Sequence, residues 1–556
     1  MSSQVIVPQT RNKDEDFSAN TKATSGRALP NHAVPSKALQ STPEPGTYAL
    51  WKSQLQAVEK LLVAQPGSVD LFFLRGRILE RLGRILEARN AYVKLLNLEP
   101  SHVGALNSLG NLLFAAGKNV AARRLYSAAV ARHPDDLMSR MNLATILMQG
   151  GEPEKAREHC EHAVRIDPNC QKAHANLSRV FATLGNSERA AWHRRTAYQG
   201  RCVFPVTYRG EQPPITVLEL VSFPWGNSPV RRFLSDRVFQ IYVAVAEFYD
   251  SATRLPPHQL VVNAIGDADL AAGALAGAQS LLAHTPAPVI NSPAAVLATG
   301  RCAIARRLAG VPGVITPNTI TLSRELLAAP DARTTLTRNG FEFPLLLRTP
   351  GFHGGQHFLR VDTPAELHAA LGKLPGRDLT VIQYLDARGP DGKTRKYRVM
   401  MIDGQLYPLH APISSHWKVH YFSAEMAGYP QHCTEEAAFL ENMAGMLGPR
   451  AMAALEAIQK TLGLDYAGID FGLNVKGEVL LFEANATMVV VPPEKDKRWD
   501  YRRPAVERIC TAVGKMLLNR AKVDPDSAVL GQQLVTKFFQ QLLGRPQYLR
   551  SSTLAQ

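Results

Sequence analysis

Three oxygen-bearing side chains near the C-terminal end of the chain are spaced so that they could hold a cation. The stretch 466–487, YAGIDFGLNVKGEVLLFEANAT, is typical of two β-strands joined at a Lys-Gly turn. With a two-residue turn at 476–477, Asp470 faces Glu483 directly, and Asn485 shares their side of the hairpin. The opposite side would carry the apolar residues of the hairpin, which are Ile469, Phe471, Leu473, Leu480 and Phe482.

Two facing carboxylates on a packed hairpin repel each other unless a cation lies between them. Magnesium is a hard cation that prefers carboxylate and amide oxygens and keeps coordination positions for water and phosphate. The sequence therefore predicts a magnesium site formed by Asp470, Glu483 and Asn485, with manganese as an alternative metal. The other interpretation is an ordinary sheet edge whose acidic residues face water.

A glycine-containing loop with a basic residue in front of it could hold phosphate. In FPLLLRTPGFHGGQHF, Arg348 ends an apolar strand and must direct its charge at a partner. Gly351, Gly354 and Gly355 allow the following backbone to approach phosphate oxygens closely and donate N–H groups to them. An ion pair inside the sheet is the alternative role for Arg348.

Two more cations share one face of a predicted strand. In KTRKYRVMMIDGQLYPLH, strand alternation places Lys396 and Arg398 on the same side before an Asp403-Gly404 turn. Because metal-binding carboxylates are expected nearby, we interpret both as phosphate and substrate contacts. Solvated cations on an edge strand are the alternative.

The order of these motifs resembles the ATP-grasp superfamily over about residues 214–522. The resemblance rests on a helix after Asn-Ser-Pro, the VPGVITPNT turn, the FPLLLR strand before the glycine-containing loop, and the closing Asp…Glu-x-Asn pattern. It implies an α+β ATP-grasp domain at 317–522 after an αβ pre-ATP-grasp domain at 214–316, with ATP between two sheets. The family usually has lysine where this chain has Arg348, and a forked guanidinium differs from an ammonium in geometry.

The resemblance also implies roles for individual residues. ATP would contact Arg301, Arg348, Gly354, Gly355, Gln383, Tyr384, Leu385 and Lys396, the stretch 383–385 lining the adenine base. Arg398 would stabilise charged oxygens during catalysis, and Lys418 would neutralise the transferred phosphate. His416 and His420 are candidate substrate contacts.

The N-terminal half contains a 34-residue repeat. Proline, glycine and alanine each recur in one register: Pro66, Pro100, Pro134 and Pro168; Gly83, Gly117, Gly151 and Gly185; and Ala88, Ala122, Ala156 and Ala190. Small residues (Gly76, Gly110, Ala144 and Ser178) fall where two helices would approach closely. The pattern resembles the tetratricopeptide repeat, which implies an all-α solenoid at 47–204 with four repeats over about 69–202 and one preceding helix near 47–64. The concave groove of such a solenoid would hold a peptide or protein partner. Alternatively, the repeats would serve as a spacer or dimerisation element.

The segment after the repeats predicts a small parallel αβ domain. ITVLELVS (215–222), QLVVNAIGD (259–267) and APVINSP (287–293) read as strands, with a helix over ALAGAQSLLA, and SPAAVLATGRCAIARRLAG predicts one further helix. We interpret Asp267 and Asp269 as helix caps, with substrate contacts as the alternative.

Composition excludes several classes of protein. A net charge of +15 would suit a polyanion, but the sequence has no basic stripe interleaved with aromatic residues, so we expect no nucleic-acid partner. The six cysteines have no C-x-x-C pairing, which argues against a zinc site or a disulfide framework. No apolar run is long enough to span a membrane and the first residues do not read as a secretory signal, so we expect a cytoplasmic protein that does not bind membranes. Residues 1–46 read as disordered, and 523–556 as an amphipathic helix and tail.

These features together predict a multidomain, ATP-dependent carboxylate-amine ligase. A small-molecule or peptide carboxylate would attack the γ-phosphate to give an acyl phosphate, and an amine would displace phosphate, joining an amino acid or peptide to an acceptor presented by the repeats. Two alternatives remain open. One is a kinase on the same fold that phosphorylates a hydroxyl, and the other is a repeat adaptor with a decayed nucleotide site.

Overall fold

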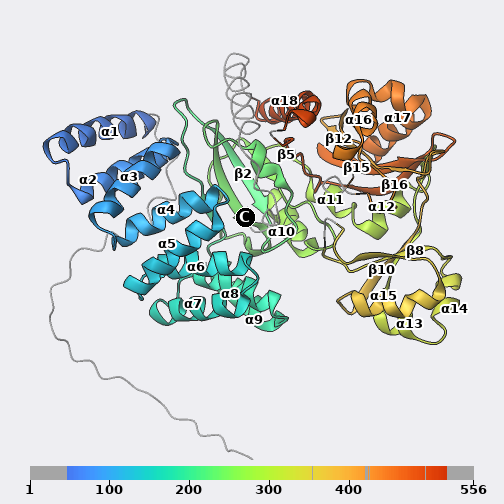
Figure 1. Ribbon diagram of the computed structural model, residues 1–556, viewed down its shortest axis with the longest axis horizontal. Helices are drawn as coiled ribbons and strands as arrows, with labels where there is room; N and C mark the ends of the chain where they lie inside the picture. The colour runs from blue at the N-terminus through green and yellow to red at the C-terminus, as the bar shows by residue number, and fades with distance from the viewer. Residues whose placement is uncertain (1–46, 353–354, 420–423, 425, 495, 523–556) are drawn as a thin grey trace, which may run out of the picture. The chain divides into compact units, whose positions relative to one another are not determined.

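A computed structural model describes residues 47–352, 355–419, 424, 426–494 and 496–522. The predicted disordered segment 1–46, the predicted helix at 523–556, Gly354 and His420 therefore lie outside the described residues. The N-terminal half is helical (Figure 1). Its helices are α1 (Thr47–Ala64), α2 (Val69–Arg81), α3 (Ile85–Leu98), α4 (Val103–Ala115), α5 (Asn119–Arg132), α6 (Leu137–Gln149), α7 (Pro153–Ile166), α8 (Gln171–Thr183) and α9 (Ser187–Tyr198). The predicted four helix pairs with one preceding helix are confirmed.

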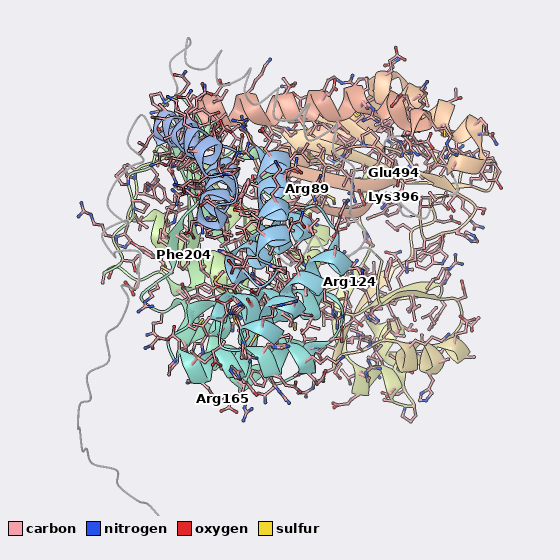
Figure 2. All side chains as sticks on the ribbon, turned by 60° about the vertical axis from the view of Figure 1, so that its left-hand side comes forward. Arg89, Arg124, Arg165, Phe204, Lys396 and Glu494 are labelled. Carbon is pink, nitrogen blue, oxygen red and sulfur yellow. The ribbon has the colours of Figure 1, made fainter. Side chains whose placement is uncertain are left out.

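The repeating glycines have two separate physical roles. Gly83 has a positive φ of 71°, and the equivalent residues Gly117, Gly151 and Gly185 also have positive φ values. This conformation allows the turn between paired helices. Gly76 and Gly110 lie where a tyrosine of the next helix packs against the backbone. A Cβ at Gly110 would stand 2.4 Å from Cε1 of Tyr126, and one at Gly76 would meet Tyr92 at the same distance. The second helices of the pairs also carry exposed cations, among them Arg89, Arg124 and Arg165 (Figure 2).

A five-stranded sheet follows the repeats, in the order β1-β3-β2-β4-β5. Its strands are β1 (Val203–Pro205), β2 (Ile215–Val221), β3 (Phe239–Val245), β4 (Leu260–Asn263) and β5 (Val289–Ile290). The last four are mutually parallel, with β1 antiparallel at the edge, and α10 (Ala272–Leu282) crosses from β4 to β5. The predicted parallel αβ arrangement is confirmed, but β1 and β3 were missed.

The prediction of a single helix over 292–310 is wrong. The structure has two helices there, α11 (Pro293–Leu297) and α12 (Arg301–Leu308). The chain breaks because Gly300 is extended, with φ −51° and ψ 143°, and packs against Asp269. This break places Arg301 at the first turn of a new helix.

Two further sheets form the rest of the α/β region. The four-stranded sheet is antiparallel, in the order β7-β10-β8-β9, from β7 (Thr319–Ser323), β8 (Leu345–Arg348), β9 (Phe358–Val361) and β10 (Asp378–Gln383). It packs with α13 (Arg324–Ala328), α14 (Ala332–Arg338) and α15 (Leu367–Lys373) around one hydrophobic core. The predicted strands around the glycine-containing loop and at 378–383 are confirmed.

The five-stranded sheet carries the predicted metal hairpin and has the order β13-β12-β15-β16-β6. Its strands are β6 (Val314–Ile315), β12 (Tyr397–Ile402), β13 (Gln405–His410), β15 (Tyr466–Leu473) and β16 (Val479–Asn485), and β11 (Thr394–Arg395) pairs separately with β14 (Ile413–Ser414). The helices α16 (Pro430–Glu441) and α17 (Met443–Leu462) pack on this sheet, and α18 (Arg503–Arg520) contacts β12 and β13. Figure 1 shows α16 and α17 beside β12 and β15, and α15 beside β8 and β10.

The predicted register of the hairpin is confirmed, although the predicted turn is wrong. Asp470 lies opposite Glu483, but the strands are joined by the five residues 474–478, in which the N–H of Asn474 donates to the carbonyl of Glu478 at 3.1 Å and Gly477 has φ 71°. A β-bulge between Asp470 and Phe471 absorbs the extra residue and restores the pairing. The bulge also changes which residues reach the core: Leu481 packs with Ile469, whereas Leu480 and Phe482 lie outside that hydrophobic cluster.

Candidate functional site

Asp470 is a buried carboxylate held by two cations of the neighbouring strand. Arg398 is its direct register partner on β12 and donates from Nε to Oδ1 at 2.5 Å and from NH2 to Oδ2 at 2.7 Å. Lys396, two residues earlier on the same face, donates to Oδ2 at 3.0 Å. Burial opposes ionisation of Asp470, but Arg398 and Lys396 outweigh it and hold its pKa well below the usual range. The predicted shared face of Lys396 and Arg398 is confirmed, and it faces an acid rather than water.

Glu483 has its own arginine from a distant part of the chain. Arg301, at the start of α12, donates from NH2 to Glu483 Oε1 at 2.9 Å. Asn485 donates from Nδ2 to the same oxygen at 3.0 Å, and its Oδ1 accepts the backbone and hydroxyl of Thr487. Burial again opposes ionisation, and Arg301 and Arg348 lower the pKa of Glu483 nonetheless. Both carboxylates are therefore charged at neutral pH.

Arg348 is a buried cation without a carboxylate partner among the described residues. It ends β8, is 9 % exposed, and hydrogen-bonds the carbonyl oxygen of Phe352. No acidic oxygen of the described chain lies within 4.0 Å of its guanidinium. Burial lowers the pKa of Arg348 to about 10, and repulsion from nearby Arg301 adds to this effect. Its surroundings therefore favour an anion.

Lys418 lies close to Arg348, across the glycine-containing loop. Its ammonium donates to the carbonyl oxygens of Gly355 at 2.5 Å and Phe358 at 3.1 Å. Burial and the charge of Arg348 lower the pKa of Lys418. Gly355 is required here because a Cβ would stand 2.8 Å from Lys418 Cε, and its φ of 76° is unfavourable for other residues. Among the described residues, the hydrogen bonds of this second cation therefore go to neutral carbonyl groups.

A small cavity opens beside Glu483. Its lining residues are Gly266, Asp267, Ala268, Asp269, Thr299, Arg301, Ile304, Ala305, Pro317, Thr319, Ile382, Leu481, Phe482, Glu483, Ala484, Asn485 and Thr487. The α12 side chains and Ile382 form an apolar part, and Arg301, Glu483 and Asn485 form a polar part. Apolar walls with a few convergent polar groups are typical of small-molecule sites.

Of the predicted site residues, three line this cavity, namely Arg301, Glu483 and Asn485. Gln383 is exposed and its Oε1 accepts the backbone N–H of Asn318 at 3.1 Å. Ile382 lines the cavity in place of Gln383, Tyr384 and Leu385, so their contact with a base stays a prediction. His416 is exposed and donates its backbone N–H to Ser414.

The interpretation as helix caps is confirmed for Asp269, which caps α12, but is wrong for Asp267, because α10 begins after Ala271 without a side-chain cap. Asp267 Oδ1 accepts the N–H groups of Asp269 and Leu270 at 2.9 and 3.0 Å, and Asp269 Oδ2 accepts the N–H of Arg301 at 3.0 Å. Both acids also line the cavity, and their charges act on Arg301 and Arg348. Their place beside the cavity agrees with the alternative interpretation as substrate contacts, which stays a prediction.

The donors fit a hard cation in their chemistry. Asp470, Glu483 and Asn485 offer carboxylate and amide oxygens, which magnesium prefers. Asp470 and Glu483 already contact Arg398, Lys396 and Arg301, so a metal would have to replace these contacts. Among the described residues no group of three or more His, Cys, Asp or Glu is placed to hold a metal ion.

Comparison with known proteins bears on the helical half of the chain. The tetratricopeptide repeat family matches residues 73–136 and 107–170. The repeats are tetratricopeptide repeats. Together with the structure, this gives a tetratricopeptide solenoid followed by a mixed α/β region.

Solved structures also match about a quarter of the chain. A crystal structure of MamA is 22 % identical, with 27 % of this chain and 88 % of that chain covered and a TM-score of 0.25. MamA from Desulfovibrio magneticus RS-1 is 23 % identical over 26 % of this chain and 83 % of that chain, with a TM-score of 0.25. YrrB, described as a tetratricopeptide-repeat protein with an unusual peptide-binding site, is 19 % identical over 27 % and 77 %, with a TM-score of 0.24. No curated protein matches the chain.

Within the part of the chain that the structure describes, no helix is both long enough and apolar enough to cross a membrane.

Proposed function

We propose that the α/β region is an ATP-grasp domain with its preceding αβ domain, and that it acts as an ATP-dependent carboxylate-amine ligase. The observation that supports this most is Arg348, a buried guanidinium at the end of β8 that has no acidic partner among the described residues. Burying a charge without a counter-charge is costly, so such a residue is explained best by an anionic ligand. Phosphate groups are the anions that arginine binds in a forked geometry.

The charge pattern around Arg348 supports a nucleotide rather than a single small anion. Cations come from four separate segments: Arg301 on α12, Arg348 on β8, Lys396 and Arg398 at the start of β12, and Lys418 after β14. When magnesium and a phosphate chain bind, magnesium would be held by Asp470, Glu483 and Asn485. The released cations would then contact phosphate oxygens. The arginine and lysine side chains of the site would exchange their carboxylate partners for phosphate partners, so that each charge would keep an opposite charge beside it.

ATP would supply a phosphoryl group, and magnesium would neutralise its charge. The substrate carboxylate would take the γ-phosphoryl group to give an acyl phosphate, ADP leaving, and an amine would displace phosphate to form an amide. Lys418 and Arg348 would bind oxygens of the transferred group, and Arg398 would stabilise the negative oxygens of both steps. Positioning and charge neutralisation account for most of what phosphoryl transfer requires.

The repeats would supply the other half of the function by holding a peptide or protein that carries one reactant. Tetratricopeptide solenoids form concave surfaces of the kind that bind extended chains. A chain with both parts would add an amino acid or peptide to an acceptor presented by its own repeats.

The test is to incubate the protein with ATP, magnesium and pooled amino acids and short peptides, and to measure ADP, free phosphate and phosphorylated acceptor separately. A ligase gives ADP and free phosphate in equal amounts. ADP with phosphate retained on a hydroxyl would replace this proposal with a kinase. ATP binding without turnover for every pool would leave an adaptor with a decayed site.

A further inference from the structure

Helix α1 holds the place of a second helix in the repeat, but no first helix precedes it among the described residues. Counting back 34 residues from α3 leads to 51–64, which is the C-terminal part of α1. In a solenoid, a second helix packs on the following repeat and also on the first helix of its own pair. Trp51, Leu55 and Val58 of α1 pack into one hydrophobic cluster with residues of α2 and α3. The face of α1 that would meet a first helix should therefore lie uncovered.

Leu61 shows this uncovered face most clearly, because it is 50 % exposed. The residues at the same position of the later repeats, at successive intervals of 34, are only 0 or 1 % exposed: Leu95, Ala129, Ala163 and Ala197. Ala57 is also exposed, whereas Ala91, its equivalent in α3, is fully buried. Helix α1 therefore exposes a face that the later second helices bury.

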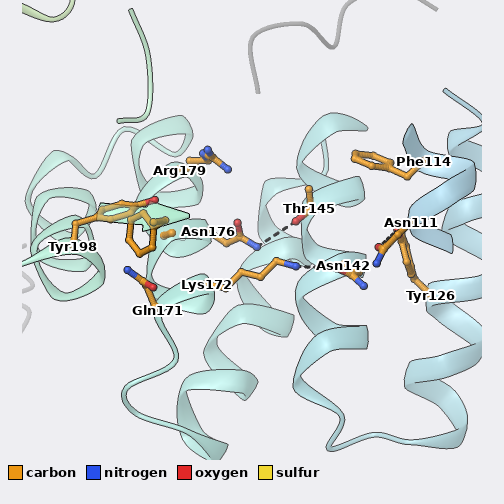
Figure 3. A pocket seen from close by; sticks show the side chains of 12 residues that line it. Asn111, Phe114, Tyr126, Asn142, Thr145, Gln171, Lys172, Asn176, Arg179 and Tyr198 are labelled. Atoms are coloured by element: carbon orange, nitrogen blue, oxygen red, sulfur yellow. Dashed lines mark hydrogen bonds between the residues drawn. The ribbon is translucent and has the colours of Figure 1, made fainter. Parts of the chain in front are cut away.

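A complete repeat covers this face with its first helix. Tyr126 of α5 is 2 % exposed, because its ring packs against Gly110 of the paired helix α4. The Tyr126 hydroxyl donates to Asn111 Oδ1 of α4 at 2.8 Å (Figure 3). Val58 is the equivalent residue of α1, and no helix takes the place of α4 beside it among the described residues. Its burial comes from the cluster with α2 and α3 instead.

The uncovered face is an apolar stripe along α1. Leu50, Ala57, Leu61 and Ala64 lie on it, with Gln54 as its polar member, and all five are exposed. They are separated by alternating intervals of four and three residues, which is the spacing by which one helix packs lengthwise on another. None of the five is charged. The stripe therefore fits a second apolar helix.

The sequence before α1 does not favour a first helix of the same repeat. Counting back 34 residues from α2 leads to 35–47. This stretch contains Pro35, Pro43 and Pro45, and proline interrupts a helix because it lacks the N–H donor. The cover of the stripe must then come from another source.

We infer that the stripe packs against the same stripe of a second copy of the chain, with the two α1 helices antiparallel about a two-fold axis. In this pairing Leu50 lies opposite Leu61 of the partner subunit, and Gln54 lies opposite the partner's Ala57. Each leucine thus covers a leucine, and each glutamine lies beside a small residue. The uncharged stripe brings no like charges together, so it is complementary to itself, as an isologous interface requires. The inference goes beyond the proposed function and does not depend on ATP.

The size of the stripe indicates a reversible dimer. Helix α1 has 18 residues and is about 27 Å long. Two helices of this length bury less than the roughly 1,200 Å² of a permanent interface, and a polar residue on the stripe lowers the affinity further. We therefore expect monomer and dimer to exchange, with the balance set by protein concentration.

Sedimentation velocity of the full chain without ATP, from about 1 to about 300 µM, tests the inference. The weight-average sedimentation coefficient should rise with concentration from that of a monomer towards that of a dimer. A coefficient that stays at the monomer value over this range overturns the inference.

Leu61→Glu and a matched control assign the dimer to α1. Because Leu61 is half-exposed in the monomer, the substitution should leave the fold intact. It would bury a carboxylate against the partner, and we expect the dissociation constant to rise at least about tenfold. Val120→Glu places the same charge on an apolar residue of α5 that is 71 % exposed, and it should leave dimerisation unchanged. An equal effect of the two substitutions, or no effect of Leu61→Glu, contradicts the assignment.

A double substitution tests the antiparallel register. Leu50→Lys combined with Leu61→Glu places opposite charges across the interface, because positions 50 and 61 face each other. The double variant should therefore dimerise more tightly than Leu61→Glu alone. Equal or weaker dimerisation of the double variant would show that the two helices do not pair in this way.

Thiol labelling distinguishes a second copy from a segment of the same chain. The thiol introduced by Leu61→Cys should react with a thiol reagent at low concentration, where the protein is a monomer, and should be protected at high concentration. Protection that does not change with concentration, in a protein that sediments as a monomer, would show that the chain covers its own stripe. That result would overturn the inference.

Discussion

Arg348 combines burial with the lack of an acidic partner among the described residues, and both features cost stability. We therefore expect the free energy of unfolding of Arg348→Met to be about 0–2 kcal/mol higher than that of the wild-type protein. The substitution replaces a buried charge by an apolar side chain of similar length. Denaturant unfolding of the two proteins measures the difference.

The matched control for Arg348 is an arginine that has its partners. Arg395 pairs with Glu435 and Asp391, so Arg395→Met should lower the free energy of unfolding by about 1 kcal/mol. A loss of stability in Arg348→Met that equals or exceeds the loss in Arg395→Met would show that Arg348 is an ordinary structural cation.

Glu483 would bind the magnesium ion that the proposed turnover of ATP requires. We predict that Glu483→Gln lowers the rate of ADP release at least about 100-fold, since an amide is a much weaker ligand for magnesium than a carboxylate. The near-isosteric amide should keep the fold, which circular dichroism would show. Glu478→Gln, in the β15–β16 loop beside Arg450, is the control and should keep its activity. Normal turnover in Glu483→Gln would refute the metal assignment.

His193 makes the last repeat sensitive to acid. Burial lowers its pKa to about 4, and the charges of His174 and Arg189 act in the same direction. The unfolded chain takes up a proton near pH 6.5, whereas the folded chain does not until about pH 4, so stability present above pH 6.5 is lost between these values. After discounting for the partial exposure of His193, the loss is about 1–2 kcal/mol.

Amide hydrogen exchange of residues 171–198 at pH 7 and pH 4.5, corrected for intrinsic rates, measures this loss of stability. His193→Gln has no proton to take up and should lose less protection on acidification than the wild-type protein does. An equal loss in both proteins would assign the acid sensitivity to other groups.

The paired helices of the repeats pack closely because a glycine of the first helix leaves room for a tyrosine ring of the second. Gly110→Ala would place a methyl group 2.4 Å from Tyr126, and we expect a loss of about 1–3 kcal/mol from overpacking. Gly273→Ala in α10 is the control, because a Cβ there meets nothing within 4 Å and alanine favours the helix. Thermal unfolding compares the two. An equal effect of both substitutions would show that helix propensity, and not packing, determines the change.

The sequence predicts some elements of this chain better than others, for physical reasons. The repeats are predictable because proline, glycine and alanine mark the same turn and the same contact every 34 residues. The break at Gly300 and the β-bulge after Asp470 are not, because each depends on a contact from a distant segment or on backbone geometry that no local pattern shows. The missed strand β3, FQIYVAV, is short and mostly apolar, and such a run does not distinguish a buried strand from a buried helix segment.

In the candidate site, too, the sequence predicts the local arrangement but not the contacts between distant segments. Strand alternation and hairpin register predict that Asp470, Glu483, Lys396 and Arg398 share one surface, and they do. Which cation meets which carboxylate depends on folding over long separations, such as the 182 residues between Arg301 and Glu483.

At the scale of the whole molecule, the account joins two binding activities in one chain. The repeats would hold a peptide or protein partner, and the α/β region would use ATP to activate a carboxylate for attack by an amine. The excess of positive charge, +15 in total, is consistent with an anionic ligand in the α/β region.

Calorimetric titration of the full chain with ATP and magnesium measures whether the buried cation at the end of β8, Arg348, binds a phosphate group. The account predicts saturable binding at one site, at least tenfold weaker in Arg348→Met and unchanged in Arg395→Met. Absence of binding at millimolar ATP, or equal affinity in Arg348→Met and the wild-type protein, would contradict it.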